Sequence, residues 1–289
     1  MKVSVIVPFR EENKMVDKCI ASLLEQTYKN KEIVTISEKQ TTFKNALIKK
    51  VLVKPCGPGK KRNAGAEIAK GNIFLFIDSD CILEKRGIEK LVKLIKEKKV
   101  DAISGTISPP RDSGFLNFLI QSEYEQRFLE MGEGYTNVLA TTCCAVKRKA
   151  FESIEGFREI STRVAIGEDW DFSARLKEKN FIFWHTNQVK VLHYSAPKLL
   201  KYLKEQYLHA RYRVFHFLKY PQHKDDYIKS NKLLLQILLY PLTILITARR
   251  ICIKSGRYSS YLLIPISLIR GVFWLVGAVA GYTKGWEGK

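Results

Sequence analysis

The stretch NIFLFIDSDCIL, residues 72–83, decides the fold. It is an apolar run typical of a buried strand, and it ends on two carboxylates, Asp78 and Asp80. Open α/β sheets bind ligands at the carboxyl edge, where such a strand delivers its last side chains. Because successive strand residues point to opposite faces, both acids reach one ion only if the chain turns at Ser79. Such oxygen ligands suit Mg²⁺ or Mn²⁺, although an isolated D-x-D is equally consistent with a solvated turn.

The first hundred residues alternate short apolar runs with helical patterns. Strands are expected near residues 3–7, 32–36, 51–53, 73–77 and 101–104, and helices near residues 15–26, 60–70 and 86–98. This alternation predicts parallel βαβ units of an α/β protein. The stretch 105–114 contains two prolines and interrupts the alternation, so the later part predicts a mixed sheet. The opening MKVSVIVPF lacks the long apolar core of a signal peptide and is expected to form the first strand.

The charge of the chain is unusual and unevenly placed. The 289 residues include 49 Lys and Arg against 29 Asp and Glu, a net charge of +20. Residues 198–289 hold 16 of those 49 basic residues but only four of the 29 acidic ones. Such asymmetry indicates a polyanionic partner, either nucleic acid or an anionic membrane surface. The excess lies among long apolar runs and no recognised nucleic-acid module appears, so we expect a membrane surface and no nucleic acid.

The last third predicts a membrane-associated helical region. Two apolar runs, 233–248 and 261–282, flank the basic segment ARRICIKSGR, residues 248–257. A spanning hairpin would place this segment on the side away from the cytosol, against the positive-inside rule, and Arg270 near mid-bilayer. Helices that lie in the cytosolic interface, or a shallow re-entrant pair, avoid both costs, whereas an ordinary buried helical core is the alternative. We therefore expect a catalytic domain over residues 1–197 and a membrane-association region over residues 198–289.

The six cysteines fit a cytosolic protein. They include no C-x-x-C pair and no metal-type spacing with histidine. We expect reduced and mostly buried thiols that behave as small apolar side chains. The catalytic part is accordingly expected on the cytoplasmic side of the cell membrane.

Four segments carry chemistry, and their order is informative. They are SVIVPFREEN (4–13), GPGKKRNAGAEIAKG (57–71), IDSD (77–80) and IGEDWDFSARL (166–176). Together they resemble the family 2 glycosyltransferases, which are inverting enzymes of the GT-A fold. The resemblance covers about residues 2–212. It implies a GT-A, Rossmann-like nucleotide-sugar-binding domain with a mixed central sheet, a nucleotide-sugar donor, and Mn²⁺ or Mg²⁺ as the cofactor.

The resemblance also implies a donor site. Its residues would be Pro8, Glu12, Lys61, Arg62, Asn63, Asp78 and Ser79, with Pro8 and Glu12 at the base and Arg62 near the diphosphate. Where the family usually has D-D-G-S after its second strand, this chain has Ile36-Ser37-Glu38-Lys39. Glu38 could replace the second acid that holds the base. This departure leaves the nucleotide open, with uridine preferred.

The metal and catalytic residues follow from the same resemblance. Asp80, the last acid of the D-x-D, would bind the cation, and His193, at the end of an expected strand, would be a further ligand or a structural histidine. Asp169 would be the general base that takes the proton of an acceptor hydroxyl, with Glu168 as the next candidate. Two acids at a helix start are also favoured by the helix dipole alone, which is the plainer interpretation of this pair.

The function expected from these residues is transfer of a sugar from a nucleotide-diphosphate sugar, preferably a UDP-sugar. The acceptor would be a hydroxyl of a lipid-linked or glycan molecule at the cytosolic membrane face. A polyprenyl- or dolichyl-phosphate sugar synthase is the alternative, in which a phosphate acceptor needs no general base. A non-catalytic membrane scaffold and a nucleic-acid binder with a Rossmann-like core are weaker alternatives.

Overall fold

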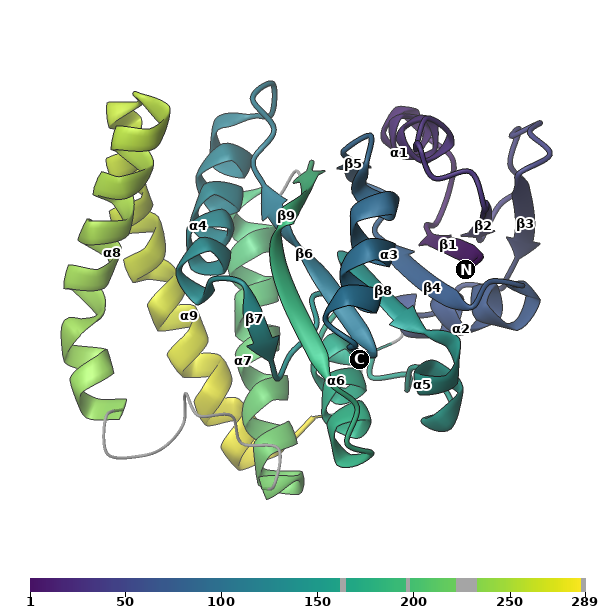
Figure 1. The fold of residues 1–289 in the computed structure, drawn as a ribbon. Coiled ribbons are helices and arrows are strands. Elements are labelled where there is room, and N and C mark those ends of the chain that lie inside the picture. The colour runs from purple at the N-terminus through teal and green to yellow at the C-terminus, as the bar shows by residue number, and fades with distance from the viewer. Residues whose placement is uncertain (162–164, 196–197, 222–232, 287–289) are drawn as a thin grey trace. The chain divides into compact units, whose positions relative to one another are not determined.

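The computed structural model describes residues 1–161, 165–195, 198–221 and 233–286 (Figure 1). They divide into two compact units. The first takes in Met1–Pro110 and Phe128–Tyr194, and the second takes in Arg111–Arg127 and Ser195–Glu287. The second unit is therefore built from two segments of the chain, one from its middle and one from its last third.

A mixed sheet forms the centre of the first unit. Its order is β3-β2-β1-β4-β8-β6-β9-β5, with β7 added to β9. The strands are β1 (Val3–Pro8), β2 (Lys31–Ser37), β3 (Ile48–Leu52), β4 (Ile73–Ile77), β5 (Cys81–Leu83), β6 (Ala102–Ser108), β7 (Gly134–Thr136), β8 (Cys143–Lys147) and β9 (Phe183–His193). Strands β3, β2, β1 and β4 are parallel, whereas β8 is antiparallel to both β4 and β6. The predicted change from parallel to mixed pairing is confirmed.

Helices cover both faces of this sheet, and every residue of β4 is therefore buried. Ile73, Leu75 and Ile77 pack on one face with α1 (Lys14–Leu24) and α3 (Gly87–Glu97). Phe74 and Phe76 pack on the other with α2 (Pro58–Ile68), α5 (Arg148–Ser153) and α6 (Glu168–Glu178). A strand buried on both faces reads as a continuous apolar run, which is why residues 73–77 lack alternation.

The second unit is helical. It contains residues 115–127 of α4 (Phe115–Met131), together with α7 (Leu199–Lys219), α8 (Leu233–Ser255), a 3₁₀ turn (Tyr258–Leu262) and α9 (Leu263–Lys284). Most of the basic segment 248–257 belongs to α8 and does not form a separate link between the two apolar runs. Helix α8 continues to Ser255 because its buried stripe, Ile244, Ala248, Ile251 and Cys252, keeps helical spacing through that segment.

Helix α9 has an inverted distribution of side chains. Its buried positions are Leu263, Ser267, Arg270, Gly277 and Gly281, whereas Leu268, Val272, Leu275, Val276 and Val279 are exposed. A Cβ atom at Gly277 or Gly281 would lie 2.2 or 2.3 Å from a carbonyl oxygen of α7, so only glycine permits this approach. Among the described residues, the stretch Tyr258–Lys284 is the one helix long and apolar enough to cross a membrane.

Arg270 does not face the exposed side of α9. Its guanidinium donates to both carboxylate oxygens of Glu123 on α4, at 2.6 and 2.8 Å, and to the hydroxyl of Tyr202 on α7 at 3.0 Å. Arg127 also pairs with Glu123, at 2.5 Å. The arginine that interrupts the apolar run therefore joins three helices inside the unit.

Candidate active site

The carboxyl ends of the parallel strands bring the first group of predicted residues to one edge of the sheet. Pro8 ends β1, and the loop after it is tied to the end of β2 because the Glu38 N–H donates to the Arg10 carbonyl at 2.9 Å. The Glu38 carboxylate pairs with the buried Lys61 ammonium at 2.5 Å. Both residues are predicted to lie in the donor site, and the structure adds that they form an ion pair with each other.

The predicted base contact Glu12 lies in the loop after β1. Its carboxylate accepts hydrogen bonds from the N–H and hydroxyl of Thr42, at 2.6 and 2.5 Å. These two residues border an open hollow of about 490 Å³ that Glu11, Lys39 and their neighbours also line. The loops after β1 and β2 therefore form a concave surface at the sheet edge.

Arg62 is the centre of the second group. It lies on α2, and its side chain is 2% exposed. One end of the guanidinium donates to Asp78 Oδ1 at 2.8 Å, and the other donates to Glu168 Oε1 at 3.2 Å. Its face lies 5.4 Å from the ring centre of Phe157. A fully buried arginine needs such partners, so this residue joins the ends of β4 and the start of α6.

Glu168 and Asp169 begin α6 after Gly167, whose φ of 73° lies in the left-handed region. Burial raises the pKa of the Glu168 carboxyl, although Arg62 opposes this rise. Burial and then the neighbouring Glu168 raise the pKa of Asp169 to about 7. Asp169 Oδ1 accepts from the Trp170 N–H at 2.9 Å. A carboxyl group with this pKa can accept a proton near neutral pH, which a helix-capping acid with an ordinary pKa does poorly.

The Asn63 side chain is hydrogen-bonded to the backbone of Phe157. Its amide donates to the Phe157 carbonyl at 2.7 Å and accepts from the Phe157 N–H at 2.9 Å. Both ends of the side chain are thereby engaged, and they fix the ring that lies on Arg62. The expectation that Asn63 contacts the donor stays a prediction.

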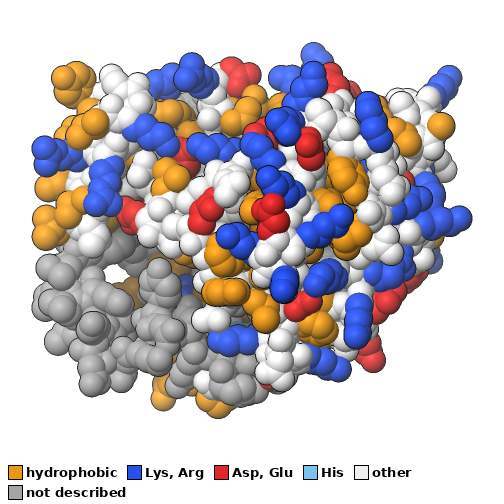
Figure 2. Space-filling view, in the orientation of Figure 1, with side chains coloured by type: hydrophobic (Ala, Val, Ile, Leu, Met, Phe, Trp, Pro, Cys, Tyr) orange, Lys and Arg blue, Asp and Glu red, His pale blue; other side chains and the backbone are white. Residues whose placement is uncertain are grey.

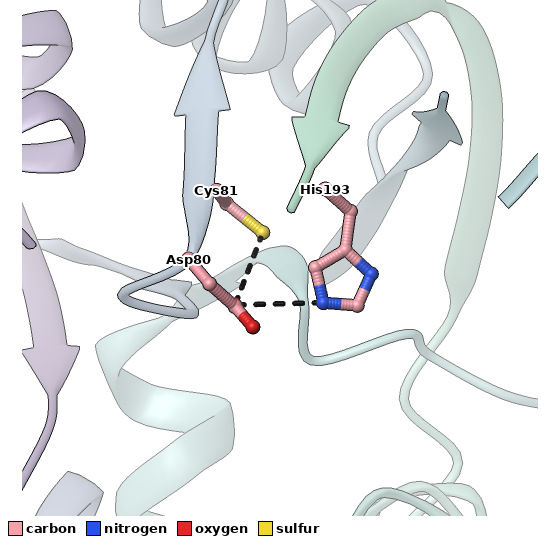
Figure 3. Close-up of side chains that lie close together, drawn as sticks. All are labelled: Asp80, Cys81 and His193. Atoms are coloured by element: carbon pink, nitrogen blue, oxygen red, sulfur yellow. Dashed lines mark hydrogen bonds and ion pairs between the residues drawn. The ribbon is translucent and has the colours of Figure 1, made fainter. Parts of the chain in front are cut away.

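The turn expected at Ser79 is present, and it directs the two aspartates apart. Asp78 faces Arg62, whereas Asp80 faces His193, with Asp80 Oδ1 3.4 Å from His193 Nε2 (Figure 3). Burial alone would lower the pKa of His193, but the Asp80 and Asp78 carboxylates outweigh it and raise the pKa. The turn is fixed because the Tyr194 N–H donates to the Asp80 carbonyl at 2.8 Å.

A third donor, Cys81, lies beside this pair, although the sequence predicts for it only the role of a small buried apolar side chain. One ligand atom each of Asp80, Cys81 and His193 lies within 4.8 Å of the others. The Asp80 carboxylate is the kind of ligand that Mn²⁺ and Mg²⁺ prefer, so it fits the cation that the sequence predicts, and the His193 imidazole lies beside it. The thiol could not be found from the sequence, because its place opposite His193 depends on the pairing of β5 with β9.

Comparisons with known proteins identify the class. The profile of glycosyl transferase family 2 matches residues 4–155, and the chain therefore belongs to this family. A solved mannosyltransferase, PcManGT from Pyrobaculum calidifontis in complex with GDP-Man and Mn²⁺, aligns with a TM-score of 0.61. The alignment covers 98% of this chain and 87% of that chain at 18% sequence identity, and it confirms the GT-A fold.

The relatives found by sequence match only part of this chain and a similar or even smaller part of their own length. Glycosyltransferase GlyG of Streptococcus pneumoniae serotype 4 is 27% identical over 114 residues, which are 36% of this chain and 38% of that protein. The poly(ribitol-phosphate) beta-glucosyltransferase of Bacillus spizizenii is 27% identical over 121 residues, which are 37% of this chain and 19% of that protein. The chain thus spans less than two fifths of the length of these relatives.

Proposed function

We propose that the protein is an inverting glycosyltransferase that moves a sugar from a nucleotide-diphosphate sugar to an acceptor hydroxyl. The observation that carries this proposal is the carboxyl group of Asp169. It lies at the start of α6 next to the Arg62 network, and its pKa is raised to about 7. A base with this pKa is largely deprotonated just above neutral pH and still accepts a proton from a hydroxyl in the transition state.

The donor would lie along the sheet edge. We assign the base to Pro8, Glu12 and Glu38, and the diphosphate to Lys61, Arg62, Asn63, Asp78 and Ser79. Arg62 is held by two carboxylates before any donor arrives, so its cation is already oriented toward the end of β4. A preorganised cation stabilises the negative charge that develops as the sugar leaves.

The cation would be held by Asp80 and His193. A bound Mn²⁺ or Mg²⁺ supplies positive charge that stabilises the leaving diphosphate. Asp80 is 40% exposed, so a carboxylate oxygen is accessible, and His193 fixes its orientation from β9. The PcManGT complex with Mn²⁺ supports a cation in a protein of this fold.

The nucleotide and the sugar of the donor can be identified by measuring donor binding. A UDP-sugar is preferred from the family resemblance, whereas the PcManGT complex contains GDP-Man. Calorimetry of the full chain with UDP-, GDP- and dTDP-sugars, each with Mn²⁺, would identify the donor. Tighter binding of a GDP-sugar than of every UDP-sugar would show that Glu38 does not select uracil.

The acceptor would be a hydroxyl of a lipid-linked or glycan molecule. The Bacillus relative is named for transfer to poly(ribitol-phosphate), a polymer of polyol units, which supports a hydroxyl acceptor. A polyprenyl- or dolichyl-phosphate acceptor would need no base, because its oxygen is already ionised. Asp169→Asn therefore separates the two proposals. Turnover should fall by about 10²-fold or more with donor affinity unchanged, and near wild-type turnover would favour the phosphate acceptor.

We also propose that the second unit holds the enzyme at the cytosolic face of the membrane. A helix of a water-soluble protein buries its large apolar side chains, whereas α9 exposes them and packs on α7 through glycines. Close packing through small residues is typical of helices in lipid. Figure 2 shows apolar and basic side chains interspersed over the upper part of α8. Arg249 and Arg250 of this helix are exposed and suit anionic headgroups.

The membrane proposal is tested on the exposed face of α9. Val272, Leu275 and Val279 are 60%, 64% and 56% exposed. Their joint replacement by Glu should abolish flotation with phosphatidylglycerol vesicles and leave the fold intact. The matched control replaces three exposed apolar residues of the first unit, Leu52, Tyr135 and Ile182, by Glu. Equal loss of flotation in both variants would contradict the proposal.

The side of the membrane is tested by labelling. Ser259 is exposed in the turn between α8 and α9. A cysteine at this position should react with a membrane-impermeant thiol reagent from the cytosolic side alone if the helices lie in that interface. Reaction from the opposite side would show that the two helices span the bilayer.

A further inference from the structure

The cation site contains a donor that a purely hard-metal site does not need. Cys81 Sγ lies 4.0 Å from Asp80 Oδ1, and Asp80 Oδ1 lies 3.4 Å from His193 Nε2. Figure 3 shows the three side chains directed toward one another. Mg²⁺ and Mn²⁺ prefer oxygen ligands, whereas a thiolate prefers Zn²⁺ and other borderline or soft cations. The site therefore combines a carboxylate and an imidazole with a thiol, and the thiol shifts the preference of the site from Mn²⁺ or Mg²⁺ toward Zn²⁺.

The distances suit a tetrahedral ion. With Zn–S near 2.3 Å and Zn–N or Zn–O near 2.0 Å, neighbouring ligands of tetrahedral zinc lie about 3.3–3.6 Å apart. Two of the three separations here are 3.4 and 4.0 Å, and all three are within 4.8 Å. Shifts of a few tenths of an ångström to about one ångström, within the reach of side-chain torsions, would bring all three donors onto one ion.

Backbone pairing holds these donors in place. Cys81 of β5 and His193 of β9 are direct partners in an antiparallel ladder, so their side chains leave the same face of the sheet. Asp80 is held next to them because its carbonyl accepts from the Tyr194 N–H at 2.8 Å. Donors fixed on strands lose little freedom on binding, which favours affinity.

The site is accessible from one side. Cys81 is fully buried, His193 is 17% exposed and Asp80 is 40% exposed. A cation would therefore enter past the Asp80 carboxylate and meet the thiol last. Three protein ligands with a fourth position open to water or substrate is the arrangement of catalytic zinc sites, whereas structural zinc sites have four protein ligands.

We propose that Asp80, Cys81 and His193 form a site for Zn²⁺ or another thiophilic divalent cation, which binds there more tightly than Mn²⁺ or Mg²⁺. On binding, the Cys81 thiol gives its proton to the buffer and the sulfur bonds to the metal. If the proposed function is right, this inference deepens it, because Zn²⁺ would displace the hard cation and inhibit transfer. The preference over Mn²⁺ agrees with the general order of divalent affinities, and the thiolate enlarges it.

Cobalt spectroscopy tests the site without any assay of activity. Full-length protein, reduced and under anaerobic conditions, is titrated with Co²⁺. The expected result is a thiolate-to-cobalt charge-transfer band in the near ultraviolet together with the strong visible bands of a four-coordinate site. Cys81→Ser should remove the charge-transfer band, whereas Cys19→Ser, which changes another fully buried thiol, should keep it.

Competition with a zinc indicator then measures selectivity. Wild-type protein should bind Zn²⁺ at least about 10²-fold more tightly than Mn²⁺, and Cys81→Ser should weaken Zn²⁺ binding by at least about tenfold while changing Mn²⁺ binding little. Cobalt bound without a charge-transfer band in the wild type would overturn the inference, even if the variants fail to fold. A thiolate spectrum in a protein that transfers no sugar would keep this inference and reject the proposed function.

Discussion

The raised pKa of Asp169 leads to a specific pH dependence of turnover. The base works only when deprotonated, and its pKa lies near 7 rather than at its ordinary value of 3.8. With saturating donor, acceptor and cation, the logarithm of turnover should rise with unit slope against pH up to about pH 7 and then level off. At pH 6 about one tenth of the protein would hold the deprotonated base. With an ordinary pKa, the profile would be flat from pH 5 to pH 9.

The cause of the shift can be tested separately. Burial acts first on Asp169, and the negative charge of Glu168 acts second. Glu168→Gln removes that negative charge, while the positive charge of Arg62 still lowers the pKa of Asp169. The rising part of the turnover profile should therefore move to lower pH. Glu67→Gln, on the exposed surface of α2, is the matched control and should leave this part of the profile in place.

Stability supplies a second measurement of the same group. Because the folded pKa of Asp169 lies above its unfolded value, the protonated form stabilises the fold at low pH and this contribution is lost as pH rises toward 7. Asp169→Asn should therefore raise the melting temperature at pH 8 and change it little at pH 4. A wild-type turnover profile that is flat down to pH 5, with no gain in stability for Asp169→Asn, would refute the reasoning.

Three further predictions follow from the contacts. Asp80→Ala should abolish cation-dependent donor binding in calorimetry while the circular dichroism spectrum stays unchanged, and equal affinity with and without this carboxylate would sink the assignment. Arg62→Met should lower the free energy of unfolding by about 3–5 kcal/mol, because it leaves two carboxylates without their buried partner, and adding Glu168→Gln should restore part of it in denaturant titrations. Gly281→Ala should lower the melting temperature because its Cβ would lie 2.3 Å from a carbonyl oxygen of Arg211, whereas Gly114→Ala, with open space around it, should not.

Much of the first unit could be predicted from short-range pattern. The apolar run 73–77 predicted a buried strand, and the acids after it were placed correctly at the carboxyl edge. The start of α6 at Glu168 and the end of β9 at His193 were also placed correctly. These features depend on neighbouring residues, because strand and helix signals are local. The free and mostly buried state of the cysteines is likewise confirmed.

The partners of the site residues could not be predicted. Arg62 was expected near a diphosphate, yet its guanidinium is held by Asp78 and Glu168, which are 16 and 106 residues away in the sequence. Cys81 and His193 lie opposite each other only because β5 reverses after the turn at Ser79 and pairs with β9. No local pattern contains such a pairing, since its register depends on the packing of the whole sheet.

By itself the sequence determined the α/β class, the order of the motifs and the apolar, basic character of the last third, because composition and periodicity are properties of contiguous residues. Only the tertiary structure decided that α4 joins the second unit, that Arg270 pairs with Glu123, and that α9 turns its large apolar side chains outward. Hydropathy records how apolar a helix is but not which of its faces finds a partner. That choice is made where glycines let two backbones approach, and it is set by residues far apart in the chain.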